Sequence, residues 1–220
     1  MTLCPDSTVS LVAPSLSNCP FSQSTPLKLG VMASGSGSNF EAVAEAIAKE
    51  QLNAQIQVLI YNNPSAKAPI RAANRGVEAV LLNHRDYGNR EAFDGAIVKT
   101  LQQYDVDWVI MAGWMRLVTP VLIDAFIDKI INIHPSLLPS FKGINAVEQA
   151  LASGVKITGC TVHLVCLEVD SGPILIQAAV PILPEDTAET LHARIQIQEH
   201  RILPQAIAIA AAREISQNNS

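Results

Sequence analysis

The sequence predicts an α/β fold built on a doubly wound, mostly parallel β-sheet, and three observations support this. Short apolar runs alternate with segments of helical periodicity from residue 28 to residue 133, as in repeated βαβ units. The residues are 49% hydrophobic but only 5% aromatic, so the core is aliphatic, as expected for strands that helices cover on both faces. A length of 220 residues suits one domain.

The first part of the chain carries the alternation of strands and helices. We expect strands at residues 29–33, 56–61, 79–82, 108–111 and 130–133, where short apolar runs occur. We expect helices at residues 39–50, 66–75, 90–103 and 120–126. Since a helix follows each strand, the strands should run parallel.

Beyond Pro139 the pattern changes. A helix at residues 146–152 precedes two expected strands at 157–165 and 174–180, and the turn at 170–173 between them is typical of a hairpin. This part of the sheet should therefore be antiparallel. A long closing helix is expected at residues 187–213, with one apolar face formed by Leu191, Ile195, Leu203 and Ile207. Together these elements predict a single Rossmann-like domain.

The ends of the chain are expected to lie outside this domain. Residues 1–27 are interpreted as a disordered N-terminal extension, residues 28–215 as the folded domain and residues 216–220 as a flexible tail. The uncharged stretch at residues 7–27 is interrupted by three prolines, so it does not predict a membrane helix, and no basic residue precedes Lys28 to form a secretory signal.

The cysteines indicate a reducing compartment. They show no C-x-x-C spacing, which favours free thiols over a disulfide framework or a zinc site; they are Cys4, Cys19, Cys160 and Cys166. We therefore expect a cytoplasmic protein with no metal and no membrane partner. The formal net charge of −5, without a basic stripe, also argues against nucleic-acid binding.

A small anionic ligand would need local donors, and the loop after the first strand offers them. Its sequence is Ser-Gly-Ser-Gly-Ser-Asn, at residues 34–39. Two glycines let the backbone approach a ligand, and N–H groups at a helix N-terminus bind phosphate well. The loop also has a purely structural interpretation, in which Ser38 and Glu41 form a capping box, and both interpretations can hold. It is not a dinucleotide fingerprint, because Phe40 stands at the third glycine, and it lacks the Gly-Lys-Ser/Thr of a P-loop.

A polar pair at the end of the strand at 130–133 predicts catalysis. Asn132 and His134 are two residues apart before Pro135, so their side chains point to the same face of the strand. An amide can polarise a carbonyl, and an imidazole can move a proton near neutral pH. The alternative is an asparagine that turns the chain and a histidine satisfied in the core. Asp170 is ordinarily a turn residue, but if the hairpin folds back over His134 its carboxylate would orient the imidazole and favour its protonated form.

The remaining histidines and cysteines are interpreted as structural. His163 is expected to be a hydrogen-bonded core residue, and His84 and His192 are expected at the surface. For His200 an ion pair with Glu199 is as plausible as a ligand contact. Two cysteines are expected to be core residues on a strand face rather than nucleophiles, namely Cys160 and Cys166.

Four segments together carry a family resemblance. The Asn-x-His-Pro-Ser-Leu-Leu-Pro run at 132–139, the loop at 34–39, the Ala-Gly-Trp-Met-Arg-Leu run at 112–117 and the Asp-Ser-Gly-Pro turn at 170–173 resemble the folate-dependent formyltransferases. The early loop and residues 198–200 are similar to the branch that formylates glycinamide ribonucleotide. The resemblance covers residues 29–213. It implies transfer of the formyl group of 10-formyltetrahydrofolate, as co-substrate, to the amine of 5-phosphoribosylglycinamide in de novo purine biosynthesis.

The resemblance also implies roles for individual residues. The catalytic set would be Asn132, His134 and Asp170. The ribonucleotide would contact the phosphate loop and one residue near its ribose, that is Gly35, Ser36, Gly37, Ser38, Asn39 and Glu199. The folate would contact Arg90, Met115, Arg116, Leu117, Val118 and Asn132. The amine would attack the formyl carbon directly, and Asn132 and His134 would stabilise the tetrahedral intermediate. The partners would be small molecules, with a monomer or homodimer as the assembly.

Some residues depart from the family pattern. Lys142 stands where the family often has proline, and Asn145 and Val147 stand where many members have histidine, so substrate contacts in this loop stay open. A formyltetrahydrofolate deformylase, a formyltransferase acting on methionyl-tRNA and a non-catalytic phosphosugar-binding module are alternative functions. The tRNA enzyme should carry a further RNA-binding domain, and the binding module has no need for the Asn132, His134 and Asp170 set.

Overall fold

The structure is a computed structural model that describes residues 11–14 and 25–218, with backbone only for residues 214–218. Within these residues one sheet has the strand order β1-β8-β7-β6-β5-β2-β3-β4. The strands are β1 (Val12–Ala13), β2 (Leu27–Ala33), β3 (Ala54–Tyr61), β4 (Ala79–Leu81), β5 (Trp108–Met111), β6 (Ile130–His134), β7 (Ile157–Leu164) and β8 (Ile174–Pro181).

The sheet has a parallel part and an antiparallel part. Strands β4, β3, β2, β5 and β6 run parallel, whereas β6, β7, β8 and β1 pair antiparallel. Because β2 lies between β3 and β5, the chain reverses its direction of winding there, and ligands of open α/β sheets collect beside such a point. The expected α/β fold, its antiparallel far part and its closing helix are all confirmed.

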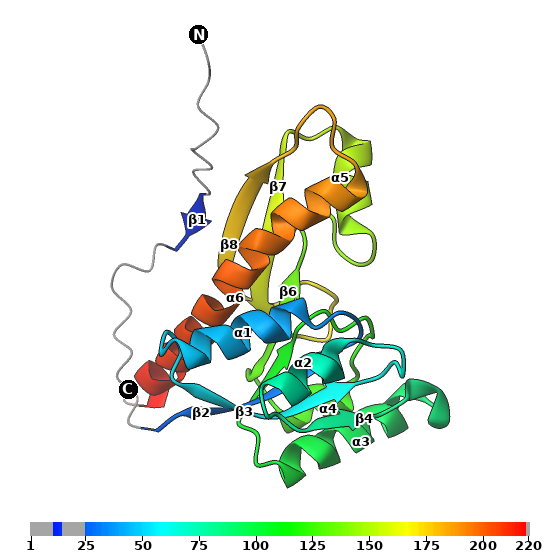
Figure 1. Cartoon of the computed structure of the whole chain (residues 1–220), viewed down its shortest axis with the longest axis vertical. Coiled ribbons are helices and arrows are strands. Elements are labelled where there is room, and N and C mark those ends of the chain that lie inside the picture. The colour runs from blue at the N-terminus through cyan, green and yellow to red at the C-terminus, as the bar shows by residue number, and fades with distance from the viewer. Residues whose placement is uncertain (1–10, 15–24, 219–220) are drawn as a thin grey trace.

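Helices cover both faces of the sheet (Figure 1). They are α1 (Ser38–Ala48), α2 (Ala68–Asn74), α3 (Arg90–Gln103), α4 (Pro120–Ala125), α5 (Ala146–Ser153) and α6 (Ala188–Asn218), with a short 3₁₀ turn at His84–Asp86. One core cluster joins the sheet to apolar residues of α1, α2 and α6, including Phe40, Ala72 and Leu203. A second cluster on the other face includes Phe93 and Leu122, from α3 and α4. The central strand β5 is thus buried on both faces along its whole length, which explains its uninterrupted apolar sequence.

Several expected boundaries differ from the structure. Strand β1 was not expected; its two residues extend the sheet by pairing with Ala178 and Gln177 of β8. Apart from residues 11–14 and 25–27, the proposed extension at 1–27 lies outside the described residues. Helix α6 continues as backbone to Asn218, into the proposed tail at 216–220.

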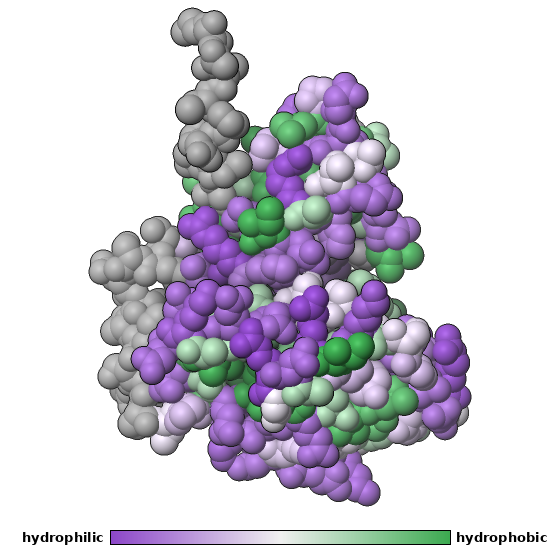
Figure 2. Space-filling model, in the orientation of Figure 1, coloured by the Kyte–Doolittle hydropathy of each residue, from purple (hydrophilic) through white to green (hydrophobic). Residues whose placement is uncertain are grey.

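The surface around α1 and α6 is largely hydrophilic, with scattered hydrophobic residues (Figure 2). No helix in the described part of the chain is long and apolar enough to cross a membrane.

Candidate active site

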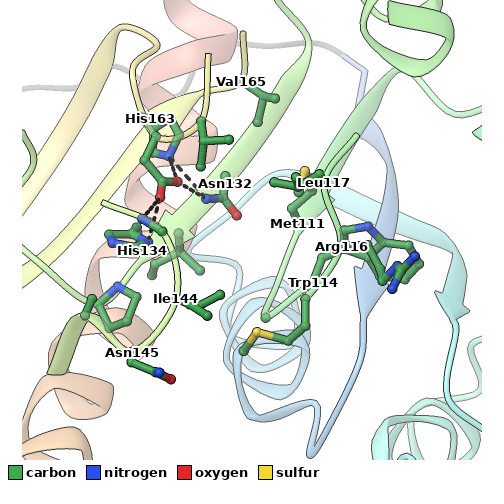
Figure 3. A pocket seen from close by; sticks show the side chains of 18 of the residues that line it. Met111, Trp114, Arg116, Leu117, Asn132, His134, Ile144, Asn145, His163 and Val165 are labelled. Atoms are coloured by element: carbon green, nitrogen blue, oxygen red, sulfur yellow. Dashed lines mark hydrogen bonds and ion pairs between the residues drawn. The ribbon is translucent and has the colours of Figure 1, made fainter. Parts of the chain in front are cut away.

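A cavity of about 660 Å³ opens where β5 and β6 end. Its volume falls in the range typical of small-molecule sites. The segment after β5 forms one wall, and the end of β6, the start of α5 and the loop after β7 form the facing wall (Figure 3). The predicted catalytic residues Asn132, His134 and Asp170 all line it, as do the folate-side residues Arg90, Met115, Arg116, Leu117 and Val118.

The hairpin does fold back over His134, so the contact that the sequence left open is made. Asp170 Oδ2 is 3.3 Å from His134 Nδ1 and accepts a hydrogen bond of 2.8 Å from the Gly143 backbone N–H. The other oxygen, Oδ1, lies 3.5 Å from the amide nitrogen of Asn132. One carboxylate therefore holds both members of the strand-end pair and the loop that precedes α5.

The hydrogen-bond partners of His134 define its tautomer. Its Nε2 lies 2.9 Å from the carbonyl oxygen of Phe141. Since a carbonyl can only accept, Nε2 must carry a hydrogen. Nδ1 is then the ring atom that can gain or lose a proton, and it faces Asp170. The side chain is only 6% exposed, so this exchange takes place away from bulk solvent.

Asp170 is ionised in this setting. Burial alone would raise the pKa of its carboxyl, but the hydrogen bonds from His163 and Gly143 and the nearby His134 ring outweigh that effect and hold the pKa below its ordinary value. The carboxylate can accept a hydrogen bond from His134 Nδ1, which lies 3.3 Å away. The pair can therefore hold a proton at Nδ1 and release it to a neighbouring atom.

The loop at residues 34–39 leaves the N-terminus of α1 open. Gly37 caps the helix in the left-handed conformation (φ 72°), and no side chain caps the first turn. The predicted capping box is therefore wrong: Glu41 instead accepts a hydrogen bond of 2.8 Å from Arg75 Nε. Arg71 Nε holds the loop from outside through the Ser36 carbonyl at 2.9 Å. The N–H groups of an uncapped first turn, together with the helix dipole, have the geometry that favours an anion.

Asn39 and Glu199 form a buried pair beside this loop. The Asn39 amide donates a hydrogen bond of 3.0 Å to Glu199 Oε2, which joins α1 to α6. Burial raises the pKa of Glu199, although Asn39 and the charges of His192 and His134 act in the opposite direction. The Asn39 side-chain oxygen is buried and has no hydrogen-bond partner, so it is free to accept from a ligand.

The loop at residues 34–39 is hydrogen-bonded to one wall of the cavity, although its residues and Glu199 do not line the cavity itself. Ser34 begins the glycine loop, and its hydroxyl accepts a hydrogen bond of 2.9 Å from the Met115 backbone N–H. Its own N–H donates to the Gly113 carbonyl at 3.1 Å. A ligand with an anionic group on α1 could thus extend toward the catalytic set along the ends of adjacent strands.

Comparison with known proteins agrees with this geometry. The family model described as formyl transferase matches residues 27–207. The chain is 43% identical over 180 residues to phosphoribosylglycinamide formyltransferase of Bacillus subtilis, covering 82% of this chain and 92% of that one. The structure of glycinamide ribonucleotide transformylase 1 from Symbiobacterium toebii is 45% identical, with a TM-score of 0.85 over 87% of this chain and 91% of that one.

The chain belongs to the formyl transferase family. Longer proteins also match the chain. The human trifunctional purine biosynthetic protein adenosine-3 is 42% identical over 185 residues, which cover 84% of this chain. The chain spans about a fifth of the length of that relative (18%). The family resemblance seen in the sequence motifs is therefore confirmed, and so is the expectation of an enzyme.

Sequence reasoning missed part of this formyl transferase site. His163 is buried as expected, yet it lines the cavity and lies 3.5 Å from Asp170 Oδ1. Cys166 was expected in the core on a strand, but it follows β7 and also lines the cavity, whereas Cys160 is buried in the core. His192 is exposed at the cavity, while His84 lies apart from it and contacts the Asn62 carbonyl at 3.2 Å.

The loop that departs from the family pattern closes one side of the cavity. Asn145 and Val147 line it. Lys142 points to the neighbouring loop, where its Nζ is 2.5 Å from the Ser171 hydroxyl and 3.3 Å from Glu168. Lys142 therefore joins the two loops that carry Gly143 and Asp170.

Proposed function

We propose that the chain transfers the formyl group of 10-formyltetrahydrofolate to the amine of 5-phosphoribosylglycinamide, giving the formylated ribonucleotide and tetrahydrofolate in purine biosynthesis. One observation carries the proposal: an ionised Asp170 lies 3.3 Å from His134 Nδ1, beside Asn132, in a cavity large enough for a small molecule. An imidazole that carries a proton and an amide that can both reach the same substrate carbonyl suit acyl transfer to an amine.

The two substrates suit the two parts of the site. The cavity wall after β5 offers apolar side chains and backbone groups to the flat pterin, with Met115 76% and Leu117 53% exposed. Arg90 and Arg116 add positive charge that complements the carboxylates of a folate. The open N-terminus of α1 suits the ribonucleotide phosphate, and the Asn39–Glu199 pair suits a ribose hydroxyl.

The mechanism follows from the residue types. The glycinamide amine attacks the formyl carbon, and the carbonyl oxygen becomes an oxyanion in a tetrahedral intermediate. Protonated His134 Nδ1 and the Asn132 amide donate hydrogen bonds to that oxygen, and each such donor typically contributes about 10²–10³ in rate. Asp170 stabilises the imidazolium and takes part in removing the proton from the attacking nitrogen. The tetrahydrofolate nitrogen then leaves with the electron pair of the broken C–N bond and receives a proton.

An assay of both substrates tests the proposal. The full chain is incubated with 10-formyltetrahydrofolate, with and without 5-phosphoribosylglycinamide, and folate deformylation is followed. We expect turnover only when the ribonucleotide is present. Turnover without it would indicate a hydrolase, and turnover under neither condition would favour a binding module.

A pair of histidine variants tests the mechanism. His134→Ala should lower kcat by about 10²–10³, because it removes one oxyanion donor. His84→Ala is the matched control, since His84 is also a partly buried histidine bonded to a carbonyl but does not line the cavity. A near-normal kcat for His134→Ala would refute the mechanism.

A further inference from the structure

The loop between β6 and α5 holds two members of the proposed catalytic set through its backbone. The carbonyl of Phe141 accepts a hydrogen bond from His134 Nε2 at 2.9 Å. The N–H of Gly143 donates one to Asp170 Oδ2 at 2.8 Å. These two groups belong to the peptide bonds on either side of Lys142, because a peptide bond joins the carbonyl of one residue to the N–H of the next. The placement of Lys142 therefore sets both contacts.

This loop has a backbone conformation that needs outside support. Phe141, Gly143 and Asn145 have φ angles of 56°, 79° and 58°, all in the left-handed region. Residues with a Cβ, such as Phe141 and Asn145, keep this conformation only where the surrounding structure holds them. The end of the loop is held by Gln149 of α5, whose side-chain nitrogen donates to the Ile144 carbonyl at 2.8 Å. The start of the loop must be held by other groups.

The side chain of Lys142 supplies such a contact. It reaches the loop between β7 and β8, where its Nζ donates to Ser171 Oγ at 2.5 Å and lies 3.3 Å from Glu168 Oε1. The Ser171 hydroxyl donates its own hydrogen to the Val169 carbonyl at 2.9 Å, so its oxygen can accept from the ammonium group. Ser171 directly follows Asp170, so Lys142 holds the segment that carries the catalytic carboxylate.

We propose that Lys142 is a positioning residue that joins the loop before α5 to the loop after β7 and so holds His134 Nδ1 and Asp170 Oδ2 at their separation of 3.3 Å. This inference rests on the proposed formyl transfer. The two peptide groups beside Lys142 bond one to His134 and the other to Asp170, and its side chain bonds Ser171. A reacting group displaced by about 1 Å can cost about 10²-fold in rate, so this support matters for catalysis.

The position of Lys142 separates this role from two others. Lys142 does not line the cavity, although Ile144 and Asn145 of the same loop do and lie on the same side as His134 (Figure 3). An effect of Lys142 on the rate would therefore act through the loop. Its side chain is 37% exposed and that of Glu168 is 78% exposed, and ion pairs this exposed contribute little to stability. A positioning role thus predicts a change in rate without a matching change in stability.

Hydrogen exchange at the Gly143 amide tests the inference without any substrate. NMR follows this amide in the native full chain, in Lys142→Met and in Lys49→Met. Lys49 is the matched control, because it forms an ion pair of 2.6 Å with Glu45 but does not line the cavity. Exchange should be about tenfold faster in Lys142→Met, because the loop opens more often, and unchanged in Lys49→Met. Equal exchange in all three chains would overturn the inference.

Steady-state kinetics provide the second test. Lys142→Met should lower kcat about tenfold and change the KM for the ribonucleotide by less than about twofold, because the phosphate loop is untouched. Lys142→Arg should restore most of kcat, since a guanidinium can donate to the same two side chains. Ser171→Ala should add little to the loss in the Lys142→Met chain, because both substitutions remove the same bond.

The outcomes of these tests are distinct. Urea unfolding should give nearly the same stability for Lys142→Met and the native chain; a large loss of stability that accompanies the loss of kcat would indicate a structural role and overturn the inference. A normal kcat for Lys142→Met, or additive losses with Ser171→Ala, would also overturn it, while formyl transfer by the native chain leaves the proposed function standing. Absence of transfer by the native chain would refute the proposed function itself, and with it the inference.

Discussion

Replacing Gly37 by alanine should destabilise the protein and weaken ribonucleotide binding. Two separate effects oppose a side chain at this position. Its φ of 72° lies in the left-handed region, and a Cβ would lie 2.8 Å from both the Cα and the Cβ of Ala68. Neither atom of Ala68 belongs to a flexible side chain, so α2 itself must move.

The expected magnitude follows from these two effects. A left-handed conformation costs a residue with a Cβ about 1–2 kcal/mol. Overpacking against a fixed neighbour typically costs about 1–3 kcal/mol. The reduced freedom of the unfolded chain returns about 0.4–1 kcal/mol, which leaves a net loss of about 1–5 kcal/mol in the free energy of unfolding.

The same loop supplies the control. A Cβ on Gly35 would meet no atom within 4 Å, and the φ of Gly35 is outside the left-handed region. Gly35→Ala should therefore change the free energy of unfolding by about 1 kcal/mol or less. Urea unfolding measures both variants, and the KM for the ribonucleotide should rise for Gly37→Ala while the KM for the folate changes little. Equal destabilisation by both substitutions would refute the reasoning.

Three further predictions concern buried groups. Asp94→Ala should lower the free energy of unfolding, measured in urea, by about 2–4 kcal/mol. The substitution removes the acceptor of two hydrogen bonds, which the Thr119 N–H and hydroxyl donate at 2.6 and 2.8 Å. A loss below about 1 kcal/mol would contradict this prediction. Burial raises the pKa of Glu199 above its unfolded value, so the ionised carboxyl costs stability at higher pH. The Tm of Glu199→Gln should match that of the native chain near pH 4 and exceed it increasingly toward pH 8; a gap independent of pH would count against it. Iodoacetamide should modify Cys166 and spare Cys160, because Cys160 is buried and burial raises the pKa of its thiol. Peptide mapping that finds Cys160 modified first would contradict this prediction.

The positions of most strands and helices could be read from the sequence, because apolar periodicity depends on local geometry. Helix α3 (Arg90–Gln103) and strand β5 (Trp108–Met111) have the expected bounds. Strand β1 could not be predicted, because two residues become a strand only by pairing with β8. The capping box failed for a related reason: the local pattern was present, but Arg75, which follows α2, bonds Glu41.

The site shows the same division. The cavity contains all the residues expected at the folate and at the formyl group. His163 was interpreted as a core residue because nothing near it in the sequence shows its partner. That partner follows from the antiparallel register of β6 and β7, which places His163 opposite Asn132. Register depends on how whole strands pack, so single-strand patterns do not reveal it.

The sequence by itself determined the strand-end pair of Asn132 and His134, since side chains two apart in a strand always share a face. It also determined a glycine loop at the start of a helix, where residues without a Cβ let the backbone approach a ligand. Only the tertiary structure decided that Asp170 reaches His134 at 3.3 Å and that His163 faces the same carboxylate. These contacts join residues that are remote in sequence, and the fold of the β7–β8 hairpin over β6 brings them together.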